Sequence, residues 1–278
     1  MKLTLPRQFE IKDLLFSPMS SLVEDLSETE RIEQEGKPSL LKYASEQSFV
    51  STNQSTLLSM YSEYGEQEFE ETAKDISHID GLMAYTAALM SILAAITDQT
   101  VVRYVLLLLD RVTKAIQYTE AFNKPDSSLC DKLRRHLISE DAYSNGTAAL
   151  IISRFTTVDL PQNQIQAHLS WICEHLNGGK ATDFALSSLM ICLSNVKNRD
   201  IFLELGGLQL LVNVCKTCPE AQTQRIYEAC FCLWVLSFGN DFQTSEFGRS
   251  GAIDVLCGYA GKYSKRRSEH RVYGKHCS

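Results

Sequence analysis

The sequence predicts an all-α protein built as an armadillo- or HEAT-like right-handed α-solenoid. The first observation is the stretch Ile226–Phe238, which is long enough for a helix and apolar on nearly every side. A helix without a polar face has to be covered by neighbours on more than one side, so it belongs to a stack of helices. Six prolines and fourteen glycines in 278 residues are too few for a turn-rich β-sandwich.

The second observation is an internal repeat. Sliding the chain along itself by 44 residues places residues 185–211 on residues 229–255; Ala185 then aligns with Ala229, Leu189 with Leu233, Leu203 with Phe247 and Gly207 with Gly251. Each unit contains a long apolar helix, a polar turn, a short helix that ends at a glycine, and a second apolar segment. A glycine in the left-handed conformation can end one helix and let the next begin close by. A period in the low forties with this content is typical of armadillo and HEAT repeats.

Residues 1–80 form an acidic segment, with 16 Asp and Glu against 7 Lys and Arg. We expect it to be weakly and only partly ordered, with short helices that cap the solenoid or lie flexibly across it. One helix is predicted at Pro18–Glu35, with interruptions at Lys37–Pro38 and Ser51–Ser55. The acidic cluster Glu66–Glu71 is interpreted as a solvated face, with a basic partner as the alternative.

Residues 81–261 are predicted to form the repeats. In Thr100–Tyr118 the apolar residues recur every three or four positions, which indicates an amphipathic helix. Four further helices are predicted at Leu82–Ile96, Leu129–Ile138, Tyr143–Phe155 and Ile165–Leu176, separated by the breaks at 123–127, 159–162 and 177–179, before the two matched repeats.

Residues 262–278 hold six Lys and Arg against one Glu and are predicted to be a basic, disordered tail. They contain almost no aliphatic side chains, so we expect the apolar face of the last repeat, at Ile253–Leu256, to be poorly covered. The net charge of −7 argues against nucleic acid as a partner.

The composition also indicates the cellular compartment of the protein. Residues 1–10 lack the apolar core of a signal peptide, and the longest uncharged apolar run has fifteen residues, too short to span a membrane. Most of the nine cysteines lie in apolar helical runs, where free thiols pack as small hydrophobic groups, which favours a reducing compartment.

No arrangement predicts catalysis, a cofactor or a metal. Cys215 and Cys218 with Cys230 and Cys232 come closest to a zinc site, but two thiols at i, i+2 on a helix lie about 200° apart around its axis and cannot both face one ion. We interpret these four residues as core cysteines. The loop 177–182 lacks the spacing of a phosphate-binding loop, and no strand precedes it.

Tryptophan, histidine and asparagine side chains are the remaining candidates for function. Trp171 and Trp234 are interpreted as core residues, with an exposed anchor for a partner as the alternative. His168 and His175 share a helix face without a third ligand, and are interpreted as surface or groove histidines. An armadillo-type adaptor that holds an extended peptide remains an alternative, although no asparagine ladder forms, since the repeat equivalent of Asn195 is Gly239.

Four segments together resemble the H subunit of the vacuolar proton-translocating ATPase. They are Thr100–Asp110, His168–Cys173, Phe202–Val212 and Tyr227–Phe238, and they occur in the family's order between about residues 85 and 256. Residues 1–80 match weakly, and the matches stop where the family's solenoid is still in mid-stack. The family-motif positions, interpreted as structural, are Tyr104, Asp110, Trp171, Gly207, Tyr227, Phe231, Trp234, Phe238 and Gly251.

The resemblance implies a non-catalytic regulatory and scaffold subunit with an armadillo/HEAT-like fold. In that family the subunit bridges the ATP-hydrolysing sector and the membrane proton channel, contacts the stalk subunits E and G, and restrains hydrolysis when the sectors separate. The resemblance also implies a cytoplasmic protein, peripheral on the cytosolic face of vacuolar and other endomembranes, that meets the membrane only indirectly through the complex.

Overall fold

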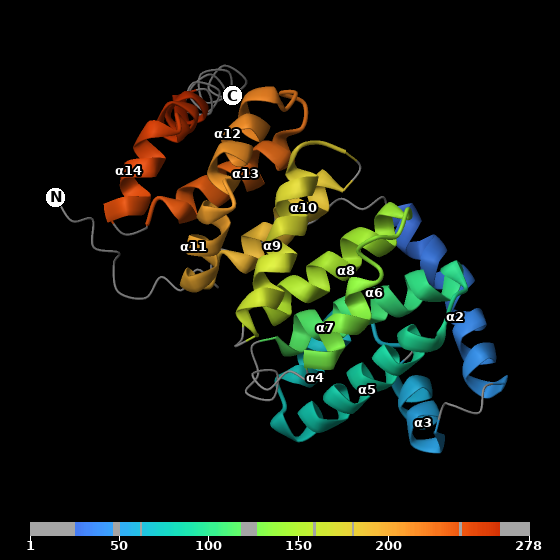
Figure 1. The fold of residues 1–278 in the computed structure, drawn as a ribbon. Helices are drawn as coiled ribbons and strands as arrows, with labels where there is room; N and C mark the ends of the chain where they lie inside the picture. Colours follow the sequence, from blue (N-terminus) through green and yellow to red (C-terminus); the bar gives the residue numbers. More distant parts are fainter. Residues whose placement is uncertain are drawn as a thin grey trace, which may run out of the picture.

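A computed structural model of the chain describes residues 26–46, 51–61, 63–117, 127–157, 160–179, 181–238 and 241–261. Their regular structure is helical. The helices are α2 (Leu26–Glu46), α3 (Thr52–Tyr61), α4 (Glu66–Ala73), α5 (Ile76–Ala95), α6 (Gln99–Ile116), α7 (Ser127–Arg134), α8 (Ala142–Phe155), α9 (Gln162–Leu176), α10 (Thr182–Cys192), α11 (Val196–Glu204), α12 (Gly207–Thr217), α13 (Thr223–Leu236), α14 (Asp241–Arg249) and a last helix Ala252–Gly261. From α5 onward they stack in chain order into an elongated, curved solenoid (Figure 1). The helices confirm the predicted all-α class.

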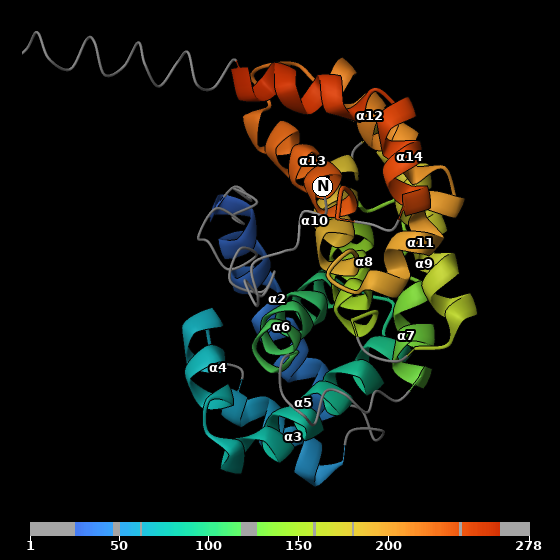
Figure 2. The same cartoon turned by 90° about the vertical axis from the view of Figure 1, so that its left-hand side faces the viewer.

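The solenoid has two sides. Helices α6, α8, α10 and α13 follow one another as rungs of a single row, each packed against the next. Figure 2 shows this row beside a second layer that contains α7, α9, α11, α12 and α14. Helix α9 joins the layers, because it contacts α8 and α10 in the first and α11 and α12 in the second.

Acidic caps fix where several helices begin. The side chains of Asp75, Asp98 and Asp141 accept hydrogen bonds from backbone N–H groups in the first turns of α5, α6 and α8, at 2.8 to 3.0 Å for the shortest bond at each cap. A cap of this kind satisfies a donor that has no partner within the helix and contributes about 1 kcal/mol. Asp141 also accepts a hydrogen bond from Arg103 Nε on α6 at 3.0 Å, so this cap ties two rungs together.

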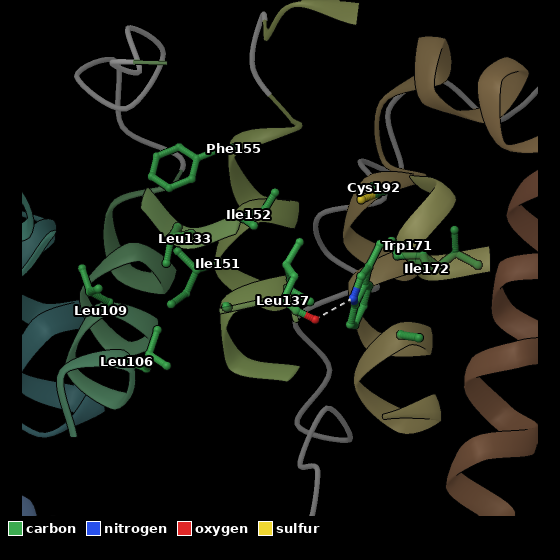
Figure 3. Close-up of a cluster of buried hydrophobic side chains, with 14 of the residues drawn as sticks. Leu106, Leu109, Leu133, Leu137, Ile151, Ile152, Phe155, Trp171, Ile172 and Cys192 are labelled. Carbon is green, nitrogen blue, oxygen red and sulfur yellow. Dashed lines mark hydrogen bonds between the residues drawn. The ribbon is translucent and has the colours of Figure 1, made fainter. Parts of the chain in front are cut away.

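The hydrophobic core runs continuously through the stack. Figure 3 shows one section of it, in which leucines of α6 and α7 meet isoleucines of α8, and Trp171 of α9 closes the layer. Leu109, Leu133 and Ile151 are completely buried there. Truncating one such side chain to alanine typically costs about 2 to 5 kcal/mol, so this layer contributes strongly to holding neighbouring rungs in register.

The described part of the acidic N-terminal segment packs more firmly than the sequence indicated. Helix α2 lies along α6, where Gly36 meets Tyr104 so closely that a Cβ atom on Gly36 would lie 2.3 Å from that of Tyr104. Ile32, Leu40 and Phe69 are buried. The expectation of weak packing is therefore wrong for these helices, because their few apolar residues fall on faces that α5 and α6 cover.

The predicted boundaries shift accordingly. Helix α2 runs through the predicted interruption at Lys37–Pro38, and α5 begins at Ile76, so the expected domain boundary after residue 80 falls inside a helix. Helix α7 ends at Arg134 and is followed by turns through Ile138. Residues 18–25 of the first predicted helix, the break at 123–126 and the tail 262–278 lie outside the described residues.

Helix α5 has 20 residues and is apolar enough to satisfy the length and composition of a membrane span, unlike the shorter run predicted from sequence. Its Leu82, Leu89 and Leu93 are fully buried, and it packs against α3, α4 and α6. It therefore serves as a core helix of the first rungs.

The repeat is present, but its register changes by one residue after the first helix. Helix α10 ends at Cys192 and α13 at Leu236, 44 positions later, whereas α12 begins at Gly207 and the last helix at Ala252, 45 positions later. Within the two repeat units, the glycines with positive φ are Gly206 and Gly251, at 75° and 79°. The predicted pairing of Gly207 with Gly251 is therefore wrong by one position: an extra residue lies between α13 and α14, which a fixed offset cannot represent.

Candidate interaction surface

Helix α13 buries one side and leaves two aromatic rings, those of Tyr227 and Trp234, exposed on the other. Ala229, Cys232 and Leu233 are completely buried, which explains why the sequence of this helix is so apolar. The helix is nevertheless not covered all round, because Tyr227 and Trp234 keep 41% and 36% of their surface exposed. The interpretation of Trp234 as a core residue is therefore wrong, and the alternative, an exposed anchor, fits its position.

We call Tyr227, Phe231, Trp234 and Phe238 the aromatic row. Their spacing of four and three residues places the first three on one face of α13, and Phe238 follows just after the helix ends. Their ring centroids are 6.5, 5.7 and 4.9 Å apart in succession, and the last pair is edge-to-face. Aromatic rings in contact restrict one another's rotamers, which lowers the entropy cost of ordering them when a partner binds.

A groove continues from the aromatic row. It is about 370 Å³ in volume and lies between α13 and the last helix, where Ile226, Tyr227 and Cys230 face Leu256 and Tyr259. On the last helix Ile253 is 51% exposed. We predicted that the apolar face at Ile253–Leu256 would be poorly covered. In the structure this face consists of the groove and the exposed Ile253.

Polar groups border the aromatic row on the side of α10. Arg225 makes a two-pronged ion pair with Asp183, with Nε to Oδ1 at 2.6 Å and Nη2 to Oδ2 at 2.8 Å. Glu228 is 4% exposed and accepts hydrogen bonds from Ser187 and Gln224. Burial raises the pKa of the Glu228 carboxyl to about 7, against the hydrogen bonds, which lower it.

Tyr104, Asp110 and Gly207 lie within the packing between helices, while Gly251 is half-buried before the last helix. Tyr104 is 2% exposed under α2, and burial raises its pKa to about 12. Asp110 pairs with the buried Arg154 of α8, at 2.7 Å from Oδ1 to Nη2, and Arg154 also donates to Thr113. Gly207 is buried against the ring of Phe202. These positions stabilise rungs and do not reach the aromatic row.

Trp171 is a core residue, as predicted, and its indole Nε1 donates to the carbonyl of Leu137 at 3.2 Å. His168 is buried as well, with its Nε2 2.8 Å from Ser153 Oγ, so its interpretation as a surface or groove histidine is wrong. Burial lowers its pKa to about 3. His175 is half-buried and stacks on Trp171 with ring centroids 4.1 Å apart.

Nothing in the described residues assembles a metal site, since no group of three or more His, Cys, Asp or Glu side chains there is placed to hold an ion. Cys232 is completely buried, whereas Cys230 is half-buried and lines the groove. Asn195 caps α11 by accepting a hydrogen bond from the backbone N–H of Lys197.

The comparison with known families decides what this solenoid is. A sequence profile for the H subunit of V-ATPases matches residues 43–256, more than half of the chain. The chain belongs to the V-ATPase H subunit family. The family match also covers residues 43–80, so the expectation that residues 1–80 as a whole match weakly is corrected for that stretch.

Individual members of the V-ATPase H subunit family are distant relatives. The V-type proton ATPase H subunit of Dictyostelium discoideum is 22% identical over 212 residues, which cover 72% of this chain and 46% of that protein. That of Drosophila melanogaster is 20% identical over 217 residues, covering 71% and 46%. The chain spans about half the length of these relatives.

The similarity to solved structures supports the fold of this chain and nothing further. A designed armadillo repeat protein in complex with the peptide (KR)4 matches with a TM-score of 0.52 at 15% identity, over 79% of this chain and 89% of that one. An engineered protein matches with a TM-score of 0.51 at 16% identity, over 73% and 52%. This member of the V-ATPase H subunit family is therefore an armadillo-like helical solenoid.

Sequence reasoning did not find the groove or the buried Glu228. The aromatic row had a signal, namely four aromatic residues at helical spacing, but the flanking apolar residues made the whole helix look covered. Lysines and glutamates that usually mark an exposed face are missing from this side of α13, so no pattern in the sequence set it apart.

Proposed function

We propose that this chain is a non-catalytic regulatory and scaffold subunit of the vacuolar proton-translocating ATPase. In this proposal it binds the peripheral stalk subunits E and G and helps couple ATP hydrolysis to proton transport. It works on the cytosolic face of vacuolar and other endomembranes and meets the membrane through the complex. The observation that carries the proposal is the family match over residues 43–256.

The aromatic row is the surface that we assign to partner binding. Tyrosine and tryptophan at the centre of a surface, surrounded by apolar neighbours, are the side chains that most often dominate binding energy. The row continues into the groove beside the last helix, so an apolar stripe on a helical partner could contact both. A rigid solenoid with such a stripe binds and positions partners and needs no reactive group to do so.

The test is capture of purified stalk subunits E and G by the full chain. We expect the double variant Tyr227→Ala with Trp234→Ala to bind at least about tenfold more weakly, since anchors of this kind cost about 2 kcal/mol or more when truncated. Absence of the wild-type chain from a pump preparation in which the other subunits are recovered would rule the proposal out.

A matched control separates the aromatic row from exposed apolar surface in general. Val196, at the start of α11, is 62% exposed and lies outside the row and the groove. Val196→Ala should bind like the wild type. If the double variant binds the stalk subunits as tightly as the wild type does, the proposed function stands, but the binding surface lies elsewhere on the chain.

A further inference from the structure

The sequence contains two Asn-Gly pairs, Asn145–Gly146 and Asn177–Gly178, and the fold places them in opposite surroundings. Asn177 follows the last residue of α9, and both it and Gly178 are exposed. Gly178 and Gly179 have positive φ of 110° and 132°, and a Cβ atom added to either would meet nothing within 4 Å. The turn between α9 and α10 is therefore open to solvent at this pair.

The first pair is held on all sides. Asn145 lies near the start of α8, is 7% exposed, and its side-chain amide donates a hydrogen bond to the carbonyl of Leu137. Gly146 is pressed against α10, since a Cβ atom there would lie 2.1 Å from Cγ of the Phe184 ring. Its backbone nitrogen lies inside a helix, where it donates to the carbonyl four residues earlier. The same two residues are thus locked in α8 and open after α9.

We propose that Asn177 is a site of spontaneous deamidation through the backbone nitrogen of Gly178, and that the fold protects Asn145 from the same reaction. Asparagine is among the thermally labile residues. Its side-chain amide reacts when the backbone nitrogen of the next residue reaches Cγ, which requires the backbone at the asparagine to rotate. A following glycine has no Cβ to block this approach, and its own backbone rotates at little cost. The turn after α9 allows this rotation, whereas helix α8 prevents it.

The reaction needs only water. The backbone nitrogen of Gly178 attacks Cγ of Asn177, the bond from Cγ to Nδ2 breaks, and the leaving nitrogen takes up the proton of the attacking N–H and departs as ammonia. The product is a five-membered succinimide ring. Water then adds to one of the two ring carbonyls, the bond from that carbon to the nitrogen breaks, and the nitrogen regains a proton. Opening on one side gives aspartate and on the other isoaspartate, with no change in oxidation state.

The product changes both the charge and the length of the turn. A carboxylate at position 177 lies at the C-terminal end of α9, where the helix dipole disfavours negative charge, and it follows Glu174 by three positions. Isoaspartate adds a carbon atom to the backbone of a turn whose ends are tied together. Thr182 Oγ1 donates to the carbonyl of His175 at 3.0 Å and lies 3.1 Å from that of Gly179. Deamidation therefore weakens the junction between α9 and α10.

The experiment is incubation of the folded full chain at neutral pH and physiological temperature, followed by brief, mildly acidic tryptic digestion and mass spectrometry. Trypsin separates the two pairs, since Asn145 lies in the peptide 136–154 and Asn177 in the peptide 155–180, where fragmentation distinguishes it from Asn163. We expect Asn177 to convert at least about tenfold faster than Asn145, because the latter reacts only after α8 opens locally. In guanidinium chloride the two rates should become similar.

Three outcomes would overturn the proposal: equal rates in the folded chain, an Asn177 that reacts only in denaturant, or rates that still differ tenfold in denaturant, which would assign the contrast to local sequence. The wild-type chain decides this without any variant. The consequence is tested by urea unfolding of Asn177→Asp against Asn177→Gln, which differ in charge. The unfolding equilibrium constant should be about two- to fivefold larger for Asn177→Asp, and the difference should shrink with added salt. Equal stability would overturn the weakening of the junction.

Discussion

Replacing Glu228 with glutamine should stabilise the protein above neutral pH. Glu228 lies between α10 and α13, is 4% exposed, and accepts hydrogen bonds from Ser187 at 3.3 Å and from Gln224 at 3.0 Å. Burial raises its pKa from the ordinary 4.5 to about 7, with the nearby charge of Asp183 adding to the rise and Arg225 opposing it. The ionised form is therefore disfavoured in the folded state.

The direction in which stability changes with pH follows from the number of protons bound in the folded and unfolded states. Between pH 4.5 and 7 the folded chain holds a proton on Glu228 that the unfolded chain has lost, so stability falls as pH rises through this window and levels off above it. A shift from 4.5 to about 7 corresponds to about 3 kcal/mol at full effect. Glutamine keeps the shape and can accept the same hydrogen bonds, but it carries no charge to bury.

Urea unfolding of wild type and Glu228→Gln at several pH values measures this effect. We expect the advantage of the variant to grow by roughly 2 to 3 kcal/mol between about pH 5 and pH 8. Glu246→Gln is the matched control, because Glu246 lies on the exposed helix α14 and pairs only loosely with Arg249, at 3.4 Å. An advantage that stays constant with pH, or a variant that is less stable than wild type at the alkaline end, would refute the reasoning.

Three further substitutions test the ion pair between α6 and α8 and the glycines at the start of α12. Asp110→Ala should lower the free energy of unfolding by roughly 3 kcal/mol in urea titration, because Arg154 is 5% exposed and would lose the partner of its charge; a loss below about 1 kcal/mol would contradict this account. Gly206→Ala should cost about 1 to 2 kcal/mol through its left-handed backbone alone, since the space around it is open. Gly207→Ala should cost more, as its Cβ would lie 2.3 Å from the Phe202 ring; equal losses would show that packing at Gly207 had been misjudged.

Much of the fold was readable from local pattern. Five of the helices predicted between residues 82 and 176 are present, because their apolar spacing and polar breaks are strong signals. The described N-terminal helices were underestimated since their apolar residues are few, and only contact with α5 and α6 makes those few sufficient. The predicted register of the repeat is wrong after α13, because one extra residue lies between α13 and α14. A comparison at a single fixed offset cannot detect such an insertion.

The site was less predictable than the fold. Apolar and aromatic residues have the same spacing whether a neighbour covers them or not, so Trp171 and Trp234 looked equivalent in sequence. In the structure Trp171 lies under the turn at Leu137, while Trp234 lies on an open face. Coverage depends on the curvature of the stack and on which helix comes next, and neither is a local property.

The sequence by itself therefore determined the class, the repeat and the family, because each rests on residue order along single helices. Only the tertiary structure decided which rings are exposed, and that burial raises the pKa of Glu228 to about 7. These properties arise where residues far apart along the chain remove water from one another. Burial of a charge or a thiol is a property of that shared space and not of either segment alone.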